Sequence, residues 1–275
     1  MGVNNRVTFS NVIVIVWCFG SCPIIHRINH DTLIIIWWMD DTTQVLNAAK
    51  CAAGYLAADM VEDGMILGLG TGSTVFYTLD RLATRVRDGL KISGVPTSYQ
   101  TALRAREYGI PLTTLDDSPV LDLAIDGADQ VDGHLRLIKG RGAALTREKC
   151  VAAAAFRLVI VADEQKKVPV LSGIVPVEVI PFAIRPVMNH LRGLGCIPRI
   201  RDGVKKDGPV ITDNGNFILD CEFKDIPDPV EMENNLKRIP GVIESGLFSS
   251  FTRKTTVIFG SQKNCSIITS ADVFP

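Results

Sequence analysis

Residues 65–74, MILGLGTGST, lead from an apolar strand through a glycine-rich turn into a helix that continues past Leu79. Such a turn at a helix N-terminus offers free backbone N–H groups, hydroxyl donors and the positive end of the helix dipole, which suits a phosphate monoester. A plain strand-to-helix turn with a Ser/Thr cap gives the same pattern. The dinucleotide fingerprint does not fit, because Ser73 stands where it needs its third glycine, and no Lys-Ser/Thr pair closes a Walker-type loop.

Outward from this stretch, strands and helices alternate in the order expected of a doubly wound α/β sheet. An amphipathic helix is predicted over 44–60, with strands near 65–70, 90–95, 121–126, 135–139 and 158–162. After residue 167, prolines punctuate a different pattern. It predicts a helix over 180–190, short strands near 198–201, 210–212 and 217–221, and a helix over 229–239. Residues 255–259 are predicted to return to the first sheet. We therefore expect an α/β catalytic domain over 39–171 and 252–275, and a small α+β domain inserted over 172–251.

Charged side chains follow the apolar run 120–125 in a pattern typical of acid/base chemistry. Asp126-Gly127-Ala128-Asp129 comes directly after this predicted strand, Lys139 lies ten residues beyond Asp129, and Glu148 nine beyond Lys139. Ligands of open parallel sheets bind beyond the carboxyl ends of the strands. Taken alone, the tetrapeptide is equally compatible with an Asp-Gly turn carrying solvated acids.

Two further segments are predicted to complete a ligand pocket. Residues 93–98, SGVPTS, follow a strand predicted near 90–92 and begin a helix running to Tyr108. Residues 139–146, KGRGAALT, form a small-residue loop whose backbone can approach a ligand closely. The Thr146 hydroxyl is expected to N-cap the helix that carries Glu148.

Taken in order, these motifs resemble those of type A ribose-5-phosphate isomerase. The resemblance rests on residues 68–74 (GLGTGST), 96–98 (PTS), 126–129 (DGAD), 138–140 (IKG) and 143–149 (AALTREK), with the family's spacing. Residues 161–163 (VAD) with Lys166, 176–181 (PVEVIP) and 211–216 (ITDNGN) also match, so the similarity spans roughly residues 40 to 262. Two departures are Arg141, where many members have glycine, and Ala143-Ala144 in place of a Gly-Gly pair. We expect the Arg141 side chain to point away from the sugar.

The resemblance implies a Rossmann-like doubly wound sheet with an inserted ferredoxin-like α+β domain. It also implies that D-ribose 5-phosphate and D-ribulose 5-phosphate are interconverted through an enediolate. Glu148 would be the base, Lys139 the oxyanion partner, and Asp126 and Asp129 would handle hydroxyl protons. No metal or cofactor is expected, and a homodimer or homotetramer is implied. The predicted substrate-binding residues are Thr71, Gly72, Ser73, Thr74, Asp126, Gly127, Ala128, Asp129, Lys139, Gly140, Arg141, Gly142, Lys166 and Lys50.

The sequence sets one electrostatic conflict for Glu148. Its place in the first turn of a helix and the nearby lysine both lower the pKa of a carboxylate. A base that works near neutral pH needs a higher pKa, which burial would have to supply.

Composition favours a small-molecule enzyme of a reducing compartment. The chain has 275 residues, 47% of them hydrophobic, and a net charge of −1. Near-neutral charge without a basic cluster argues against nucleic-acid binding. Seven scattered cysteines without a C-x-x-C pair fit a cytoplasmic protein with no zinc site. His134, the histidine nearest the motifs, is assigned to a loop surface.

Residues 1–38 differ in composition from the rest of the chain. They hold all three tryptophans and only three charged side chains, and their apolar runs 12–19 and 33–38 are too short to span a membrane as helices. The first run could also be the core of a signal peptide, although its flanks fit poorly. Our preferred interpretation places the natural start at Met39, so that 1–38 lies outside the fold. A genuine extension or targeting peptide is the alternative.

Two other function classes share parts of this pattern. A sugar-phosphate-binding regulator would keep the phosphate loop and lose the base, whereas Glu148 and its partners are all present. A related enzyme, such as an amino-sugar phosphate deaminase or a CoA transferase, should lack the Lys-Gly…Arg-Glu-Lys arrangement.

Overall fold

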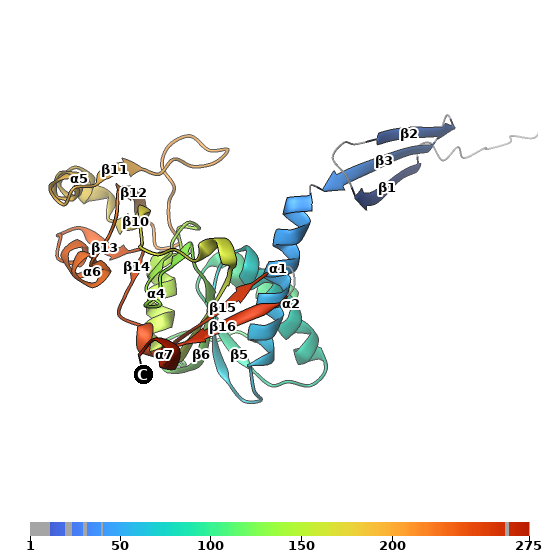
Figure 1. Cartoon of the computed structure of the whole chain (residues 1–275), viewed down its shortest axis with the longest axis horizontal. Helices are drawn as coiled ribbons and strands as arrows, with labels where there is room; N and C mark the ends of the chain where they lie inside the picture. The colour runs from blue at the N-terminus through green and yellow to red at the C-terminus, as the bar shows by residue number, and fades with distance from the viewer. Residues whose placement is uncertain (1–11, 20–23, 30–31, 40, 262–263, 275) are drawn as a thin grey trace, which may run out of the picture. The chain divides into compact units, whose positions relative to one another are not determined.

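The computed structural model describes residues 12–19, 24–29, 32–39, 41–261 and 264–274, which fall into two compact units, Met1–Ala48 and Ala49–Pro275. In the first unit, strands β1 (Val12–Phe19), β2 (Ile24–Asn29) and β3 (Thr32–Met39) form a sheet in the order β1-β3-β2 (Figure 1). The apolar runs near the N-terminus thus pair as strands, which the sequence analysis did not assign. Helix α1 (Asp41–Asp59) follows, and the predicted boundary at Met39 stays a prediction.

The main sheet of the second unit has six strands in the order β16-β15-β9-β6-β4-β5. Its first five strands along the chain are parallel, and β16 is antiparallel. The order confirms the doubly wound α/β class and the predicted return of residues 255–259 to this sheet. The topological switch point falls between β4 and β6, where ligands of such sheets bind. The strands are β4 (Ile66–Leu69), β5 (Ser93–Pro96), β6 (Leu121–Gly127), β9 (Ala155–Asp163), β15 (Thr255–Gly260) and β16 (Cys265–Thr269).

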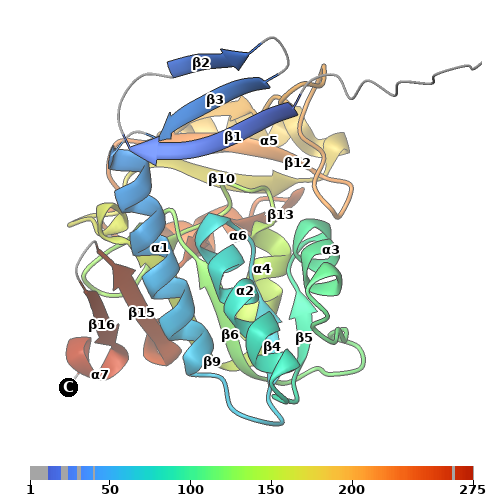
Figure 2. The same ribbon diagram turned by 90° about the vertical axis from the view of Figure 1, so that its right-hand side faces the viewer.

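Helices cover both faces of this sheet, as Figure 2 shows for α1 and α2 on the near face. Along β9, Val159 and Val161 pack against α1 and α2, while Leu158 and Ile160 pack with α4 on the opposite face. Strands buried on both faces explain why these segments read as continuous apolar runs. The helices are α2 (Ser73–Arg87), α3 (Tyr99–Glu107), α4 (Leu145–Ala154) and α7 (Ser270–Val273).

Two predicted strands of the α/β domain are corrected. Strand β5 is Ser93–Pro96 rather than 90–92, so part of the predicted loop is strand. The strand predicted near 135–139 is reduced to β8 (Leu137–Ile138), in a small sheet with β7 (Gln130–Val131) and β14 (Leu247–Phe248). Asp132 Oδ1 accepts hydrogen bonds from the amides of residues 134 and 136 and closes a tight turn, which folds β8 back antiparallel on β7. His134 is exposed on this turn, as predicted.

The inserted segment has the βαββαβ order of a ferredoxin-like fold. Its antiparallel strands lie in the order β11-β12-β10-β13, and its two helices share a separate apolar core with them. The predicted strand at 210–212 is wrong: only the isolated bridges Asp202–Pro209 and Ile211–Phe217 form there. The Val210 amide donates to the Arg201 carbonyl and the Thr212 amide to the Asn216 carbonyl, so the segment is bonded into two separate turns and not along one ladder. The elements are β10 (Gly173–Val179), α5 (Ile184–Gly193), β11 (Ile197–Ile200), β12 (Phe217–Phe223), α6 (Pro229–Lys237) and β13 (Val242–Ser245).

Short 3-10 turns join these parts: η1 (Glu164–Lys166), η2 (Pro181–Ala183) and η3 (Thr252–Lys254). The domain limits 39–171, 172–251 and 252–275 remain predictions. Of the helices described, not one combines the length and apolar character needed to cross a bilayer.

Candidate active site

Three predicted catalytic side chains meet in one buried cluster. Lys139 Nζ lies 3.0 Å from Asp126 Oδ2 and 3.2 Å from Glu148 Oε2. Each of the three residues is at most 5% exposed. Lys139 Nζ also donates to the Gly127 carbonyl and lies 5.4 Å from the centre of the Phe248 ring. A cation between two carboxylates is therefore fixed at the carboxyl end of β6, next to the switch point.

The backbone around Asp126 holds its carboxylate in one orientation. Asp126 Oδ1 accepts from the Thr71 amide at 3.1 Å and from the Gly127 amide at 2.8 Å. A Cβ on Gly70 would lie 2.6 Å from Asp126 Cα, so only glycine lets the β4–α2 turn approach β6 this closely. The glycine-rich turn and the DGAD motif, 55 residues apart in sequence, are thus joined by direct hydrogen bonds.

The electrostatic conflict at Glu148 is resolved in favour of a raised pKa. Burial is the largest cause, the neighbouring Asp126 carboxylate adds to it, and together they raise the pKa of Glu148 to about 8 despite Lys139. Burial acts to lower the pKa of Lys139, but Asp126 and Glu148 outweigh it and raise that pKa. The lysine therefore stays cationic while the glutamate can exchange a proton near neutral pH.

Glu148 Oε2 is also left without a hydrogen bond. It lies within ion-pair distance of Lys139, yet the hydrogen-bond geometry is not met and this buried oxygen has no other partner among the described residues. The closest polar neighbour of Oε2 is therefore the Lys139 ammonium at 3.2 Å.

The glycine-rich turn presents an uncapped helix end. Gly72, with φ 128°, precedes α2, and no side chain caps the first turn that Ser73 and Thr74 begin. The Thr71 hydroxyl lies 2.8 Å from those of Thr97 and Ser98 and so joins this turn to the start of α3. The amide groups of the α2 N-terminus remain available for an anion.

The predicted N-cap of α4 is wrong. The helix begins at Leu145 behind Ala144, and no side chain caps it. Thr146 lies inside the first turn, and its hydroxyl donates to Glu178 Oε2 at 2.5 Å. The helix begins at Leu145, one residue before Thr146. Thr146 is therefore a residue of the helix itself and does not occupy the N-cap position, which is Ala144.

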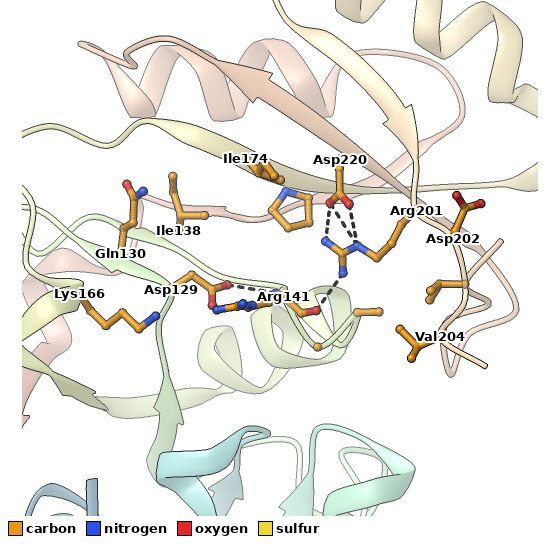
Figure 3. Close-up of a pocket in the computed structure, with 14 residues that line it drawn as sticks. Asp129, Gln130, Ile138, Arg141, Lys166, Ile174, Arg201, Asp202, Val204 and Asp220 are labelled. Carbon is orange, nitrogen blue, oxygen red and sulfur yellow. Dashed lines mark hydrogen bonds and ion pairs between the residues drawn. The ribbon is translucent and has the colours of Figure 1, made fainter. Parts of the chain in front are cut away.

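Four of the predicted binding residues border a cavity of about 620 Å³. Asp129, Arg141, Gly142 and Lys166 line one side of it, and the inserted domain lines the other (Figure 3). Asp129 Oδ2 accepts from the Arg141 amide at 3.0 Å. Arg141 is among the residues that line this cavity. We expected its side chain to point away from the sugar, and a sugar bound in this cavity would lie beside it instead. Asp126, Lys139 and Glu148 are not among the lining residues, so the cavity lies beside the buried cluster.

Not all predicted residues reach the cluster through direct contacts. The side chain of Lys50, on α1, forms no hydrogen bond or ion pair in the part of the chain that the structure describes. Its role as a substrate contact remains a prediction. Ala128 packs partly buried against the apolar core beneath the sheet.

Sequence reasoning missed the side chains of the inserted domain that hold these loops. Arg201 pairs with Asp220 and donates to the Arg141 carbonyl at 3.0 Å (Figure 3). It also donates to the Gly140 carbonyl at 3.0 Å. Lys149 binds Glu233 at 2.6 Å and Glu244 at 2.9 Å. In this region the sequence analysis matched only the segments 176–181 and 211–216 to the family, and it assigned no role to either.

Comparison with known proteins assigns the arrangement to one family. Residues 93–264 match the family model of ribose 5-phosphate isomerase A (phosphoriboisomerase A). The chain belongs to the ribose 5-phosphate isomerase A family. Its curated relatives include ribose-5-phosphate isomerase A of Methanoregula boonei, 66% identical over 237 residues that cover 86% of this chain and all of the relative. The Methanosarcina acetivorans enzyme is 59% identical over 200 residues, covering 72% of this chain and 86% of the relative.

Solved structures of the ribose 5-phosphate isomerase A family agree with the fold. The structure from Methanocaldococcus jannaschii has a TM-score of 0.77 and 42% identity, covering 80% of this chain and 98% of that one. A D-ribose-5-phosphate isomerase in complex with phospho-erythronic acid has a TM-score of 0.79 and 44% identity, covering 82% and 99%.

Proposed function

We propose that this chain interconverts D-ribose 5-phosphate and D-ribulose 5-phosphate, the aldose–ketose step of the non-oxidative pentose phosphate pathway. The observation that carries the proposal is the buried Asp126–Lys139–Glu148 cluster, in a chain of the ribose 5-phosphate isomerase A family. The substrate class is supported further by the family relative that binds phospho-erythronic acid, a four-carbon acid phosphate.

In the proposed mechanism Glu148 is the general base. It takes the proton from carbon 2 of the open-chain aldose and returns it to carbon 1, so one carboxylate serves both carbons. Its raised pKa, caused first by burial, suits this exchange near neutral pH.

Lys139 would stabilise the enediolate oxygen that develops in the transition state. Its cation is already held in place by Asp126 and the Gly127 carbonyl, so little reorganisation is needed during the reaction. Asp126 and Asp129 would move the hydroxyl protons for ring opening and for transfer between the two oxygens. The acid/base set supplies both roles without a metal ion.

The phosphate is proposed to bind at the start of α2. The uncapped amides of Ser73 and Thr74 and the hydroxyls around Thr71 support this placement. Lys166, half-buried at the cavity, is a charge partner for the substrate, and Lys50 is retained as a second one. The glycines at 72, 127, 140 and 142, with Ala128 and Arg141, would let the backbone reach the sugar.

Location and assembly belong to the same proposal. Five cysteines, at positions 51, 150, 196, 221 and 265, are free thiols, which supports a reducing, cytoplasmic compartment. A homodimer or homotetramer is proposed from the family resemblance, and light scattering measures it.

The test is turnover by the purified chain. Incubation with ribose 5-phosphate should produce ribulose 5-phosphate until equilibrium, in either direction. Binding without ketose formation would instead indicate a regulator, and ammonia release from an amino-sugar phosphate would indicate a deaminase.

A further inference from the structure

Three side chains of the helical turn that carries Glu148 are bound by the inserted domain. Thr146 donates to Glu178, and Lys149 binds Glu233 and Glu244. Arg147 donates to Asn214 Oδ1 at 2.8 Å and to the carbonyl of residue 213 at 2.7 Å. The two residues before the base and the one after it are thus all held from the same side, while the helix end itself has no side-chain cap.

Glu178 is the centre of these contacts. It is completely buried, and its Oε1 accepts from the Thr212 hydroxyl at 2.8 Å and from the side-chain amides of Asn214 at 3.0 Å and Asn216 at 2.8 Å. Of the four donors described for this carboxylate, only Thr146 belongs to α4. Several donors on one buried carboxylate fix its orientation, so Oε2 is a rigid anchor for the Thr146 hydroxyl.

A second path leads from Glu178 to the neighbour of the base. Asn214 donates its amide N–H to Glu178, and its amide oxygen accepts from Arg147. The segments 176–181 and 211–216, which carry no catalytic role in the proposed mechanism, therefore meet at the first turn of α4.

One contact is described for the Glu148 carboxylate itself, the ion pair of Oε2 with Lys139 Nζ at 3.2 Å, and Oε2 accepts no hydrogen bond. The placement of this carboxylate therefore also depends on the backbone of α4. We propose that Glu178 is a positioning residue, which fixes the general base through Thr146 directly and through Asn214 and Arg147. This inference rests on the proposed function, since it assumes that Glu148 is the base. A displacement of about 1 Å can cost roughly 10²-fold in rate, so loss of the anchor lowers turnover.

Thr146→Val tests the direct path, with Thr146→Ser as its matched control. Valine keeps the branched shape and removes the donor to Glu178, whereas serine keeps the hydroxyl. We expect T146V to lower kcat by about 10–100-fold with KM within about threefold of the wild type. T146S should keep kcat within about threefold. Thermal unfolding of each variant shows that the folded state persists at the assay temperature.

Three results would overturn the proposal: a T146V kcat within about threefold of the wild type, a loss that falls on KM alone, or T146S as slow as T146V. An inactive wild type in the same assay would refute the proposed function instead, so the two failures are distinguishable. If T146V does not fold, Arg147→Lys gives the same test by the second path. It keeps the charge and loses the guanidinium contacts with Asn214, so kcat should again fall with KM kept, and an unchanged kcat overturns the proposal.

A double variant tests whether Thr146 acts through Glu178. Glu178→Gln keeps the size of the side chain and weakens the anchor. If the two residues act as one unit, T146V/E178Q should be no slower than the slower single variant. Losses that multiply in the double variant would show that Thr146 and Glu178 act separately, against the proposal.

Discussion

Replacing the base by its amide, Glu148→Gln, is the sharpest test of the site. Glutamine has the same shape as the glutamate, which is only 5% exposed, so packing around it is kept and proton transfer is lost. General-base catalysis contributes about 10²–10⁴ in rate, which corresponds to roughly 3–5 kcal/mol of barrier at about 1.4 kcal/mol per tenfold. We expect kcat to fall by that factor or more, with little change in KM.

The pH dependence gives the same variant a second readout. Burial, followed by the Asp126 charge, raises the pKa of Glu148 to about 8, and the base acts only when ionised. Wild-type kcat/KM should therefore rise with pH, by about tenfold per unit well below the pKa, and level off above it. E148Q has no such group, so its residual activity should lack this limb.

Ketose formation from ribose 5-phosphate, followed between about pH 6 and 9, measures both effects. Glu107→Gln makes the same chemical change at an exposed glutamate of α3 and should leave turnover unchanged. Glu148→Asp keeps a carboxylate but shortens the side chain by one methylene, so its turnover should fall between that of E148Q and that of Glu107→Gln. An E148Q enzyme with more than about a tenth of the wild-type turnover would refute the assignment of the base.

The remaining predictions concern metals, the N-terminal segment and stability. Turnover should persist in EDTA, because Lys139 is proposed to stabilise the enediolate; activity lost to EDTA and restored by Mg²⁺ or Mn²⁺ would contradict this. A chain of residues 39–275 should keep full turnover and gain solubility, since the cluster and its loops lie in the second unit and apolar surface favours aggregation; an inactive or unfolded truncation would show that the boundary is wrong. Folding raises the pKa of Glu148 from 4.5 to about 8, so the folded state binds the proton more tightly than the unfolded state. The free energy of unfolding of the wild type should therefore fall relative to that of E148Q as pH rises through this window. Urea unfolding measures this difference, and a difference that does not change with pH would contradict the raised pKa.

The alternation of elements and the site motifs could be predicted because both are written locally. Buried parallel strands give apolar runs, and turns at their carboxyl ends need glycine and polar residues, so β4, β6 and their loops were located correctly. The return of residues 255–259 was predicted from one apolar run after the change in pattern.

What could not be predicted depends on distant partners. From the sequence alone, the apolar residues near 135–139 fit a further parallel strand of the main sheet as well as one arm of a hairpin. The turn closed by Asp132 decides for the antiparallel hairpin β7–β8. Thr146 stands where an N-cap is expected, and only the approach of Glu178 from the inserted domain shows its other use. Nor could the raised pKa of Glu148 be predicted, because burial depends on the whole fold.

Lys149, the residue after the base in sequence, is bound by the inserted domain. Lys149 Nζ is bound at 2.6 Å by Glu233 and at 2.9 Å by Glu244. Burial acts to raise the pKa of Glu244, but Lys149 and the other donors outweigh it and lower that pKa. Lys149 thus pairs with carboxylates of the inserted domain, whereas Lys139 is the lysine that pairs with Glu148. Burial and Asp126 raise the pKa of Glu148, and the inserted domain bears on the base through the contacts of Thr146, Arg147 and Lys149.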